Sequence, residues 1–383
     1  MSISLKKYNL KKFFEKDGFL VSIFLLASMY TLRFSMLDTY DVFRKIFMLM
    51  RILSYSLVAI KFIIDFFQQK YRGYEFFIIV ITMFMAFISY KSRTINYLTY
   101  LIYIIVGKDI EYIKIIKSAF FAIVVSVILV ISLCLFGIIK DVVSEMETRN
   151  RHALGFKYAP FLSNYSFYAT LYYIYIRKNK MKNIELLICL ILSIFIFYAT
   201  KTRSAFALTV LSLIITFVVN NVKALSDYKS IYKYLLYAAT IILPLFIIII
   251  SIFYNPEIKI MSMLNKLLNG RIALGNAAIN EYGIHLFGQY IKFTSSSTAE
   301  ARYNIVDSAF VLYLLILGIV FFVLLIIFLL YFVKLIDKKK DIYLAYIYII
   351  LMLHSTFDAQ LLQMSYNYFM FVWSYKNGIE KNE

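Results

Sequence analysis

The side chains best suited to chemistry gather in one stretch of the chain, Asn255–Asp307. Arg271, Glu281, His285 and Asp307 all lie there. Glu281 and His285 are four residues apart, and on a helix they share a face where a carboxylate could orient an imidazole for proton transfer. A glycine lies between them, and a solvated loop surface is the alternative. Asp307 is a further candidate base, although an Asp just before a helix is also a good helix cap.

Arginine is the other residue type whose placement indicates chemistry. With the N-terminus in the cytoplasm, nine arginines fall on the opposite side of the membrane, against the usual bias of basic residues toward the inside. A guanidinium is a planar fork that binds phosphate in bidentate fashion and keeps its charge when partly desolvated. This bias predicts an outward site for a phosphate-bearing ligand, and arginines that contact lipid head groups are the alternative. The nine are Arg33, Arg44, Arg51, Arg93, Arg149, Arg151, Arg203, Arg271 and Arg302.

Two basic turns and one deeper arginine sharpen this expectation. Lys91–Arg93 and Lys201–Arg203 are tight turns at the predicted outer membrane surface. Arg51 is expected about 7–8 Å below the outer end of its span, from a rise of about 1.5 Å per residue, and a charge at that depth is expected to face protein or a wet cavity. On the same span, Lys61 and Asp65 are four residues apart and are predicted to form a structural ion pair.

The elements that must position these groups are membrane-spanning helices. The chain has 383 residues, of which 62% are hydrophobic and 16% charged, and its mean hydropathy is +0.76. Apolar runs of about 20 residues are long enough to cross a hydrocarbon core about 30 Å thick. We therefore predict an all-α polytopic membrane protein with about 12 transmembrane helices, in a range of about 10–12, and one large extracytoplasmic loop. The net charge of +19 is interpreted as a bias across the bilayer, with no nucleic-acid partner.

The predicted division has three parts. Residues 1–254 form an N-terminal transmembrane bundle of about nine spans, residues 255–307 the large loop with short helices, and residues 308–383 the last spans and a cytoplasmic tail. Basic short connections predict that both termini are cytoplasmic. The predicted spans are Phe19–Leu37, Ile46–Phe67, Tyr74–Tyr90, Thr94–Val106, Ser118–Ile139, Phe161–Ile176, Asn183–Ala199, Ser204–Val222, Tyr234–Tyr254, Ser308–Val333, Asp341–His354 and Met364–Tyr375.

Known nucleotide and hydrolase motifs are not visible in the sequence. There is no Walker loop, dinucleotide fingerprint or Ser-His-Asp signature, and the 3 histidines lack zinc-type spacing, so we expect no cofactor and no metal. An enzyme that faces outward has no ATP and needs a substrate that already carries its activation. A lipid-diphosphate-linked sugar is such a substrate, with arginines holding the diphosphate as charge builds and one base taking the proton of the attacking hydroxyl.

Several short patterns, taken in order, resemble the bacterial superfamily of O-antigen/capsular polysaccharide polymerases (Wzy) and O-antigen ligases. The segments are RHALGFKYAPFLSNYSFYATL, ATKTRSAFALTVL, NGRIALGNAAINEYGIHLFGQ and VDSAFVLYLLILGIVF, which together cover roughly the second half of the chain from Arg151. They resemble the family's Arg…Gly-Phe…Pro-Asn pattern, its Thr-x-Ser-Arg turn, its Gly-Arg and Pro-Leu-Phe-Gly loop run, and its Asp-Asn or His-Asn start to the next span. His285 stands where Pro is common, and Asp307 stands where the ligases usually have His, which favours a polymerase.

The resemblance implies an inverting, metal-independent, GT-C-like glycosyltransferase. It joins undecaprenyl-diphosphate-linked oligosaccharides on the outer face of the bacterial cytoplasmic (inner) membrane. Membrane lipids, a chain-length regulator and a flippase are the implied partners. Two alternatives stay open, an O-antigen ligase-type glycosyltransferase and a lipid-linked sugar transporter or flippase.

The resemblance also assigns roles to residues. Arg203 and Arg271 match family arginines, and Arg151 matches less closely. The predicted catalytic residues are Arg203, Arg271, His285, Glu281 and Asp307, and the predicted diphosphate-binding residues are Arg93, Arg151, Arg203, Arg271 and Arg51.

Overall fold

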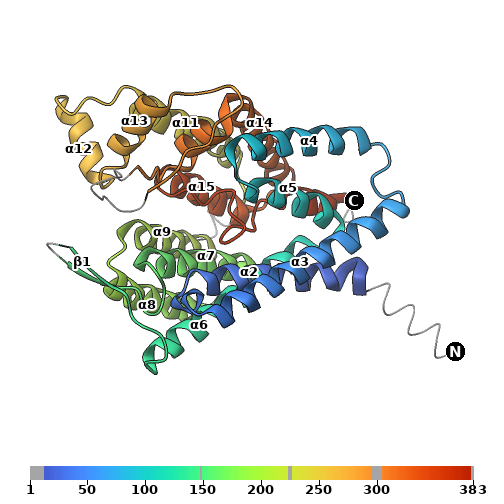
Figure 1. The fold of residues 1–383 in the computed structure, drawn as a ribbon, viewed down its shortest axis with the longest axis horizontal. Coiled ribbons are helices and arrows are strands. Elements are labelled where there is room, and N and C mark those ends of the chain that lie inside the picture. The colour runs from blue at the N-terminus through green and yellow to red at the C-terminus, as the bar shows by residue number, and fades with distance from the viewer. Residues whose placement is uncertain (1–12, 147–148, 223–226, 295–303, 381–383) are drawn as a thin grey trace. The chain divides into compact units, whose positions relative to one another are not determined.

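The computed structural model describes residues 13–146, 149–222, 227–294 and 304–380 (Figure 1). The lysines within residues 1–12 and Arg302 lie outside the described residues. One antiparallel hairpin, β1 (Val143–Met146) and β2 (Arg149–His152), stands among the helices. The α-helices are α2 (Gly18–Arg33), α3 (Asp41–Phe67), α4 (Glu75–Ser92), α5 (Asn96–Val106), α6 (Tyr112–Leu135), α7 (Ala159–Arg177), α8 (Asn183–Thr200), α9 (Arg203–Asn221), α11 (Ser230–Ile252), α12 (Lys259–Leu267), α13 (Arg271–Tyr282), α14 (Ala309–Lys339), α15 (Ile342–Phe357) and α16 (Val372–Glu380).

The structure confirms an all-α chain whose long apolar helices are those of a membrane protein, but it does not confirm the predicted number of about 12 spans. Within the described residues, seven helices are long and apolar enough to cross a membrane: α3, α4, α6, α8, α9, α11 and α14. The apolar helix α15 is shorter. A helix occupies the place of every predicted span from the first to Asp341–His354, and α12 and α13 occupy the predicted large loop.

The chain divides into two compact units that interleave in sequence. Unit 1 comprises Met1–Ile78, Leu101–Ser226 and Met364–Glu383, and unit 2 comprises Ile79–Tyr100 and Asp227–Gln363. In unit 1, α2 packs against α3 and α6, and α7 contacts α6, α8 and α9 (Figure 1). In unit 2, α11 packs against α13, α14 and α15.

The prediction of a last helical span over Met364–Tyr375 is wrong. Residues 364–371 contain no helix, and α16 begins only at Val372. All side chains from Met364 to Phe371 are nevertheless buried, which explains why hydropathy alone suggested a span. In a membrane protein, irregular backbone is tolerated where protein surrounds it and supplies its hydrogen bonds. The backbone N–H and C=O groups of Met364–Phe371 therefore require hydrogen-bond partners outside a regular helix.

Tyrosine hydroxyls supply several of these partners. Tyr172 Oη, on α7, accepts from Tyr368 N at 2.7 Å, and Tyr112 Oη, on α6, donates to Phe369 O at 2.8 Å. The Asn367 side chain accepts from Phe369 N at 3.0 Å. A side chain that bonds to nearby backbone competes with the helical pattern, so Asn367 and the surrounding tyrosines together favour the irregular path.

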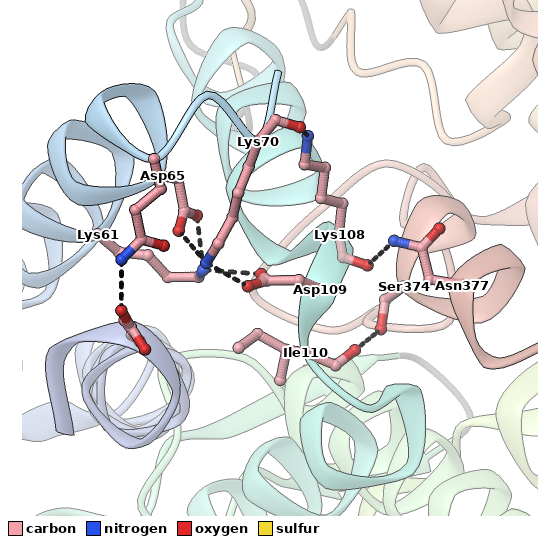
Figure 2. Close-up of polar contacts among 10 residues, drawn as sticks. Lys61, Asp65, Lys70, Lys108, Asp109, Ile110, Ser374 and Asn377 are labelled. Atoms are coloured by element: carbon pink, nitrogen blue, oxygen red, sulfur yellow. Dashed lines mark hydrogen bonds and ion pairs between the residues drawn. The ribbon is translucent and has the colours of Figure 1, made fainter. Parts of the chain in front are cut away.

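A ring of opposite charges lies at one end of α3 in unit 1 (Figure 2). The predicted Lys61–Asp65 pair is confirmed, with Nζ 2.6 Å from Oδ2 and both side chains 0% exposed. Lys61 also pairs with Asp109 at 2.7 Å, and Lys70 pairs with Asp65 at 2.6 Å and with Asp109 at 3.1 Å. Burial alone would raise the pKa of the Asp109 carboxyl, but Lys61 and Lys70 lower it below its ordinary value.

The turn that carries Asp109 also holds the C-terminal helix. Asn377 Nδ2 donates to Lys108 O at 2.6 Å, and Ser374 Oγ donates to Ile110 O (Figure 2). Lys108 Nζ in turn donates to Lys70 O at 2.5 Å. The charged ring and α16 are thus joined through one short segment of backbone.

In unit 2, α14 is a single apolar run in sequence but is broken at Gly318, where φ is 89° and ψ is 173°. The loop after α13 fits into this break, and Ile319 N donates to His285 O at 3.0 Å. Gly288, with φ 72°, lies so close to Ile316 O that an added Cβ would collide with it. Both glycines are therefore required, because each combines a positive φ with a close approach of two backbones that a Cβ would block.

Candidate functional site

Arg271 and Asp307, both predicted from the sequence, form an ion pair in unit 2. Arg271 is the first residue of α13 and follows Gly270, whose φ of 83° ends the preceding turn. Arg271 Nε donates to Asp307 Oδ2 at 3.1 Å. Ser308, not Asp307, holds the cap position of α14, so Asp307 faces the arginine instead of capping the helix as its alternative reading proposed. The two side chains are 18% and 32% exposed, which leaves the pair at the edge of the protein.

Two further ionisable residues, from the end of α15, lie near this pair. Asp358 is close enough to Asp307 to raise the pKa of its carboxyl, and His354 is within electrostatic reach of Arg271. His354 Nε2 lies 3.9 Å from Asp358 Oδ2. Burial is the main cause of the raised pKa of Asp307, and Arg271 opposes it. The sequence reasoning missed His354 and Asp358, although their spacing of four residues is the signal that singled out Glu281 and His285.

Two buried polar groups lie close in sequence to these residues. Ser308 Oγ and Gln360 Oε1 are both buried and make no hydrogen bond with the described residues. Ser308 follows Asp307 in sequence, and Gln360 lies two residues after Asp358. A buried polar atom without a partner is costly in low dielectric unless a ligand or an ordered water satisfies it.

The predicted pairing of Glu281 with His285 on one helix face is wrong. Helix α13 ends at Tyr282, because Gly283 turns the chain with φ 68°. His285 Nε2 lies 3.2 Å from Tyr282 O, and the side chain is exposed. Glu281 instead contacts the neighbouring Tyr282 and raises the pKa of its phenol. Their roles in proton transfer stay predictions without geometric support.

Arg93 meets the same loop from α4, also in unit 2. It is the residue after α4, with φ 52°, and its guanidinium lies 4.6 Å from the centroid of the Tyr290 ring. Earlier on α4, Phe87 makes an edge-to-face contact with Phe287 of the loop, with ring centroids 5.7 Å apart. Arg93 and Phe87, from the end of α4, thus each contact an exposed aromatic ring of the loop that fills the break in α14.

In unit 1, Arg151 and Arg203 are brought to one turn. Arg151 Nε donates to Thr200 O at 3.0 Å, and an Nη group donates to Thr202 Oγ1 at 3.0 Å. Lys201, with φ 50°, reverses the chain between α8 and α9. Arg203 is then the first residue of α9 and is exposed, with no ion pair among the described residues. Three cations therefore surround a helix N-terminus, where the helix dipole adds positive potential.

The remaining arginine site and one histidine have local roles. Arg51 lies within α3, is half-buried, and is close enough to Tyr30 of α2 to interact electrostatically with it. His152 Nδ1 lies 2.7 Å from Asp141 Oδ2, whose other oxygen accepts from Leu154 N at 2.7 Å. This carboxylate fixes the base of the β1–β2 hairpin that carries Arg151, and the sequence reasoning did not single it out.

Comparison of the chain with protein-family models, with curated proteins and with solved structures finds no match. What the geometry brings together is therefore the basis for assigning a function. Arg271 pairs with Asp307, and Arg93 contacts the ring of Tyr290. Arg151 donates hydrogen bonds to the turn that precedes Arg203.

Proposed function

We propose that the chain is a membrane glycosyltransferase that polymerises polysaccharide repeat units. Its substrates are two undecaprenyl-diphosphate-linked oligosaccharides on the outer face of the bacterial cytoplasmic membrane. The proposal starts from the order of the sequence patterns around Arg151, Arg203 and Arg271, and from a chain that is apolar enough to meet a lipid-linked substrate in the bilayer.

The observation that carries the proposal is shared by the two arginines that the patterns single out. Arg203 and Arg271 are each the first residue of a helix, directly after a turn with a left-handed residue. A cation at this end of a helix opposes the helix dipole and lowers stability. A guanidinium at a helix N-terminus is nevertheless a favourable arrangement for a phosphate, although in α13 the N–H groups of Arg271 and Ala273 already donate to Leu268 O and Asn265 Oδ1. Arg203 in unit 1 and Arg271 in unit 2 therefore each fit the binding of a diphosphate-bearing ligand.

Asp307 is the best placed base. Its raised pKa keeps the carboxylate more basic than an ordinary Asp, which suits proton transfer. Its bond to Arg271 Nε leaves the two Nη groups of that arginine to hold phosphate oxygens. Glu281 and His285 are exposed and turned to local backbone and side-chain partners, so they are weaker candidates.

The proposed step balances without a further reactant. Asp307 takes the proton of the acceptor sugar hydroxyl, and that oxygen forms a bond to the anomeric carbon of the donor. The bond from the anomeric carbon to the diphosphate oxygen breaks, and its electron pair leaves with the lipid diphosphate. The arginine fork binds the leaving group most strongly as this charge develops, which lowers the barrier.

The experiment is glycan analysis of a deletion strain complemented with the wild type, Arg203→Ala or Arg203→Lys. Arg72→Ala, which removes an exposed arginine from the turn after α3, is the matched control. We expect single repeat units on lipid in the deletion strain and in both Arg203 variants, and normal polymer with the wild type and the control. Normal chain lengths with Arg203→Ala would remove the assignment of this arginine. Full-length lipid-linked polymer in the deletion strain would favour the ligase, and repeat units retained in the cytoplasmic leaflet would favour the transporter.

A further inference from the structure

Helix α12 presents a stripe of apolar side chains that none of the described residues of unit 2 covers. Ile260, Met263 and Leu267 recur at a spacing of three and four residues and are 67%, 63% and 74% exposed. No residue of this nine-residue helix is buried. A helix that merely connects two elements at the surface would place polar groups at these positions. The described residues of unit 2 therefore do not supply the apolar surface that this stripe requires.

The opposite side of α12 is fixed to the protein, so the stripe has a defined direction. Asn265 Nδ2 donates to Tyr254 Oη at 3.1 Å, and Asn265 Oδ1 accepts from Ala273 N at 3.0 Å. These bonds join α12 to the end of α11 and to the first turn of α13. Met261 Sδ accepts from Asn255 N at 3.4 Å on the same side. Rotation of α12 to bury its stripe against unit 2 would break all of these contacts.

We propose that the stripe is seated in the bilayer, so that α12 is an interfacial helix at the membrane surface where α11 ends. Helix α11 is long and apolar enough to cross the membrane, and only Phe253–Ile258 separates it from α12. The exposed side chains of Ile249 and Phe253 continue the apolar surface from α11 toward the stripe. Lipid is the occupant expected for α11 because of its length and apolar composition, so one continuous lipid-facing surface would account for both helices.

The charges on α12 fit the same partner. Lys259 and Lys266 are exposed and lie beside the stripe on its polar flank. In an interfacial helix, the apolar face enters the boundary between head groups and acyl chains by about 5–10 Å, and lysines on the polar face reach the lipid phosphates. Because α12 is tethered to a spanning helix, its insertion is an intramolecular event and requires little affinity of its own.

One consequence concerns Arg271, which begins α13 four residues after α12 ends. If α12 lies in the interface, Arg271 is held at the level of the lipid phosphates, where a diphosphate carried by a membrane lipid would also lie. The seating of α12 does not depend on the proposed reaction, because it is measured without substrate.

The test is site-directed spin labelling of the full chain in liposomes of phosphatidylethanolamine and phosphatidylglycerol. Cys134 and Cys189 are first replaced by Ser, and single cysteines are introduced at Ile260, Met263 and Leu267. Lys266 is labelled as the polar-face control. Labels at Phe246 on α11 and at Glu257 serve as the lipid and water references.

We expect collisions with oxygen to exceed collisions with a water-soluble nickel chelate at all three stripe positions, as at Phe246. The order should be reversed at Lys266, as at Glu257. High access to the nickel chelate at the stripe would place it in water and overturn the proposal. Low access to both reagents would also overturn it, because the stripe would then be covered by protein, such as a second copy of the chain.

Discussion

Arg271 Nε lies 3.1 Å from Asp307 Oδ2 and joins the first residue of α13 to the residue before the cap of α14. The bond ties together the two ends of the segment that contains α13 and the loop filling the break in α14. The two side chains are only 18% and 32% exposed, and a partly buried pair of this kind contributes on the order of 1 kcal/mol to stability.

Replacing Arg271 should separate its effect on activity from its effect on folding stability. We expect Arg271→Ala to lower the rate of polymer formation by about 10²–10³-fold, the usual effect of losing one preorganised donor to developing charge. Arg271→Lys should also be strongly impaired, because a point charge does not reproduce the planar fork. Polymer formed from lipid-diphosphate-linked repeat units in proteoliposomes gives the rate, and thermal unfolding should change little. Wild-type rates in Arg271→Ala would contradict the site.

The raised pKa of Asp307 predicts a characteristic response to pH. If Asp307 takes the acceptor proton, activity falls as the pH drops through a pKa that lies above the ordinary value of 3.8. The stability effect has the opposite sign. A carboxyl whose pKa is raised on folding contributes stability that is present below its unfolded pKa and is lost as the pH rises through its folded pKa. Acidification should therefore lower activity, whereas protonation of Asp307 should not lower the folding stability.

A pH–rate profile recorded together with the unfolding temperature at each pH checks this prediction. Asp307→Asn should be inactive across the range, whereas Glu281→Gln should keep the wild-type profile. The same acid limb in an active Asp307→Asn variant would exclude Asp307 as the base. A flattened profile in Glu281→Gln would transfer the role to that carboxylate.

The spans were predictable because hydrophobic runs report burial in lipid or protein. The same signal was misleading at Met364–Phe371, since burial there comes with tyrosine and asparagine partners that a hydropathy pattern does not reveal. The four-residue rule identified Lys61 with Asp65, because both lie inside one long helix. It did not hold for Glu281 and His285, because Gly283 ends α13 between them.

The rest of the candidate site depends on contacts between distant segments. Arg271 and Asp307 were each singled out, but their pairing across 36 residues is not written in any local pattern. Asp358 reaches this pair from the end of α15, where it reads in sequence as an ordinary helix end. Tertiary packing, which brings these ends together in unit 2, decides the site.

The charged ring in unit 1 predicts a large stability effect of one substitution. Asp65 is 0% exposed and bonds to both Lys61 and Lys70. Asp65→Asn leaves two ammonium groups that share Asp109 alone, so we expect a loss of about 3–5 kcal/mol. The loss is measured by thermal unfolding of the detergent-solubilised protein. Circular dichroism follows the unfolding, and the midpoint temperature is compared between variants.

Two variants control this prediction. Asp41→Asn removes an exposed carboxylate, 85% exposed, that pairs with Arg44 on the same helix, and should change the midpoint little. The double variant Lys61→Met with Asp65→Leu removes both buried charges and should recover much of the lost stability, because apolar residues can replace a buried pair. An Asp65→Asn midpoint equal to that of Asp41→Asn would show that the ring contributes little.

The break in α14 gives the last prediction. Gly318 has φ 89°, and an added Cβ would collide with Gly288 N and with the carbonyl oxygen of His285. Gly73, in the turn after α3, has a similar φ of 84° but nothing within 4 Å of the same position. Both alanine substitutions strain the backbone through a positive φ, by on the order of 1 kcal/mol, and Gly318, with ψ 173°, lies in a region that is almost exclusive to glycine. Only Gly318→Ala must also displace backbone, so we expect it to unfold at a clearly lower temperature than Gly73→Ala and to release the loop that carries His285.

Hydrogen exchange at the amides of Ile319 and Val320, which donate to that loop, measures the release. Equal midpoints and unchanged exchange in the two variants would mean that the loop is not held by the break in α14.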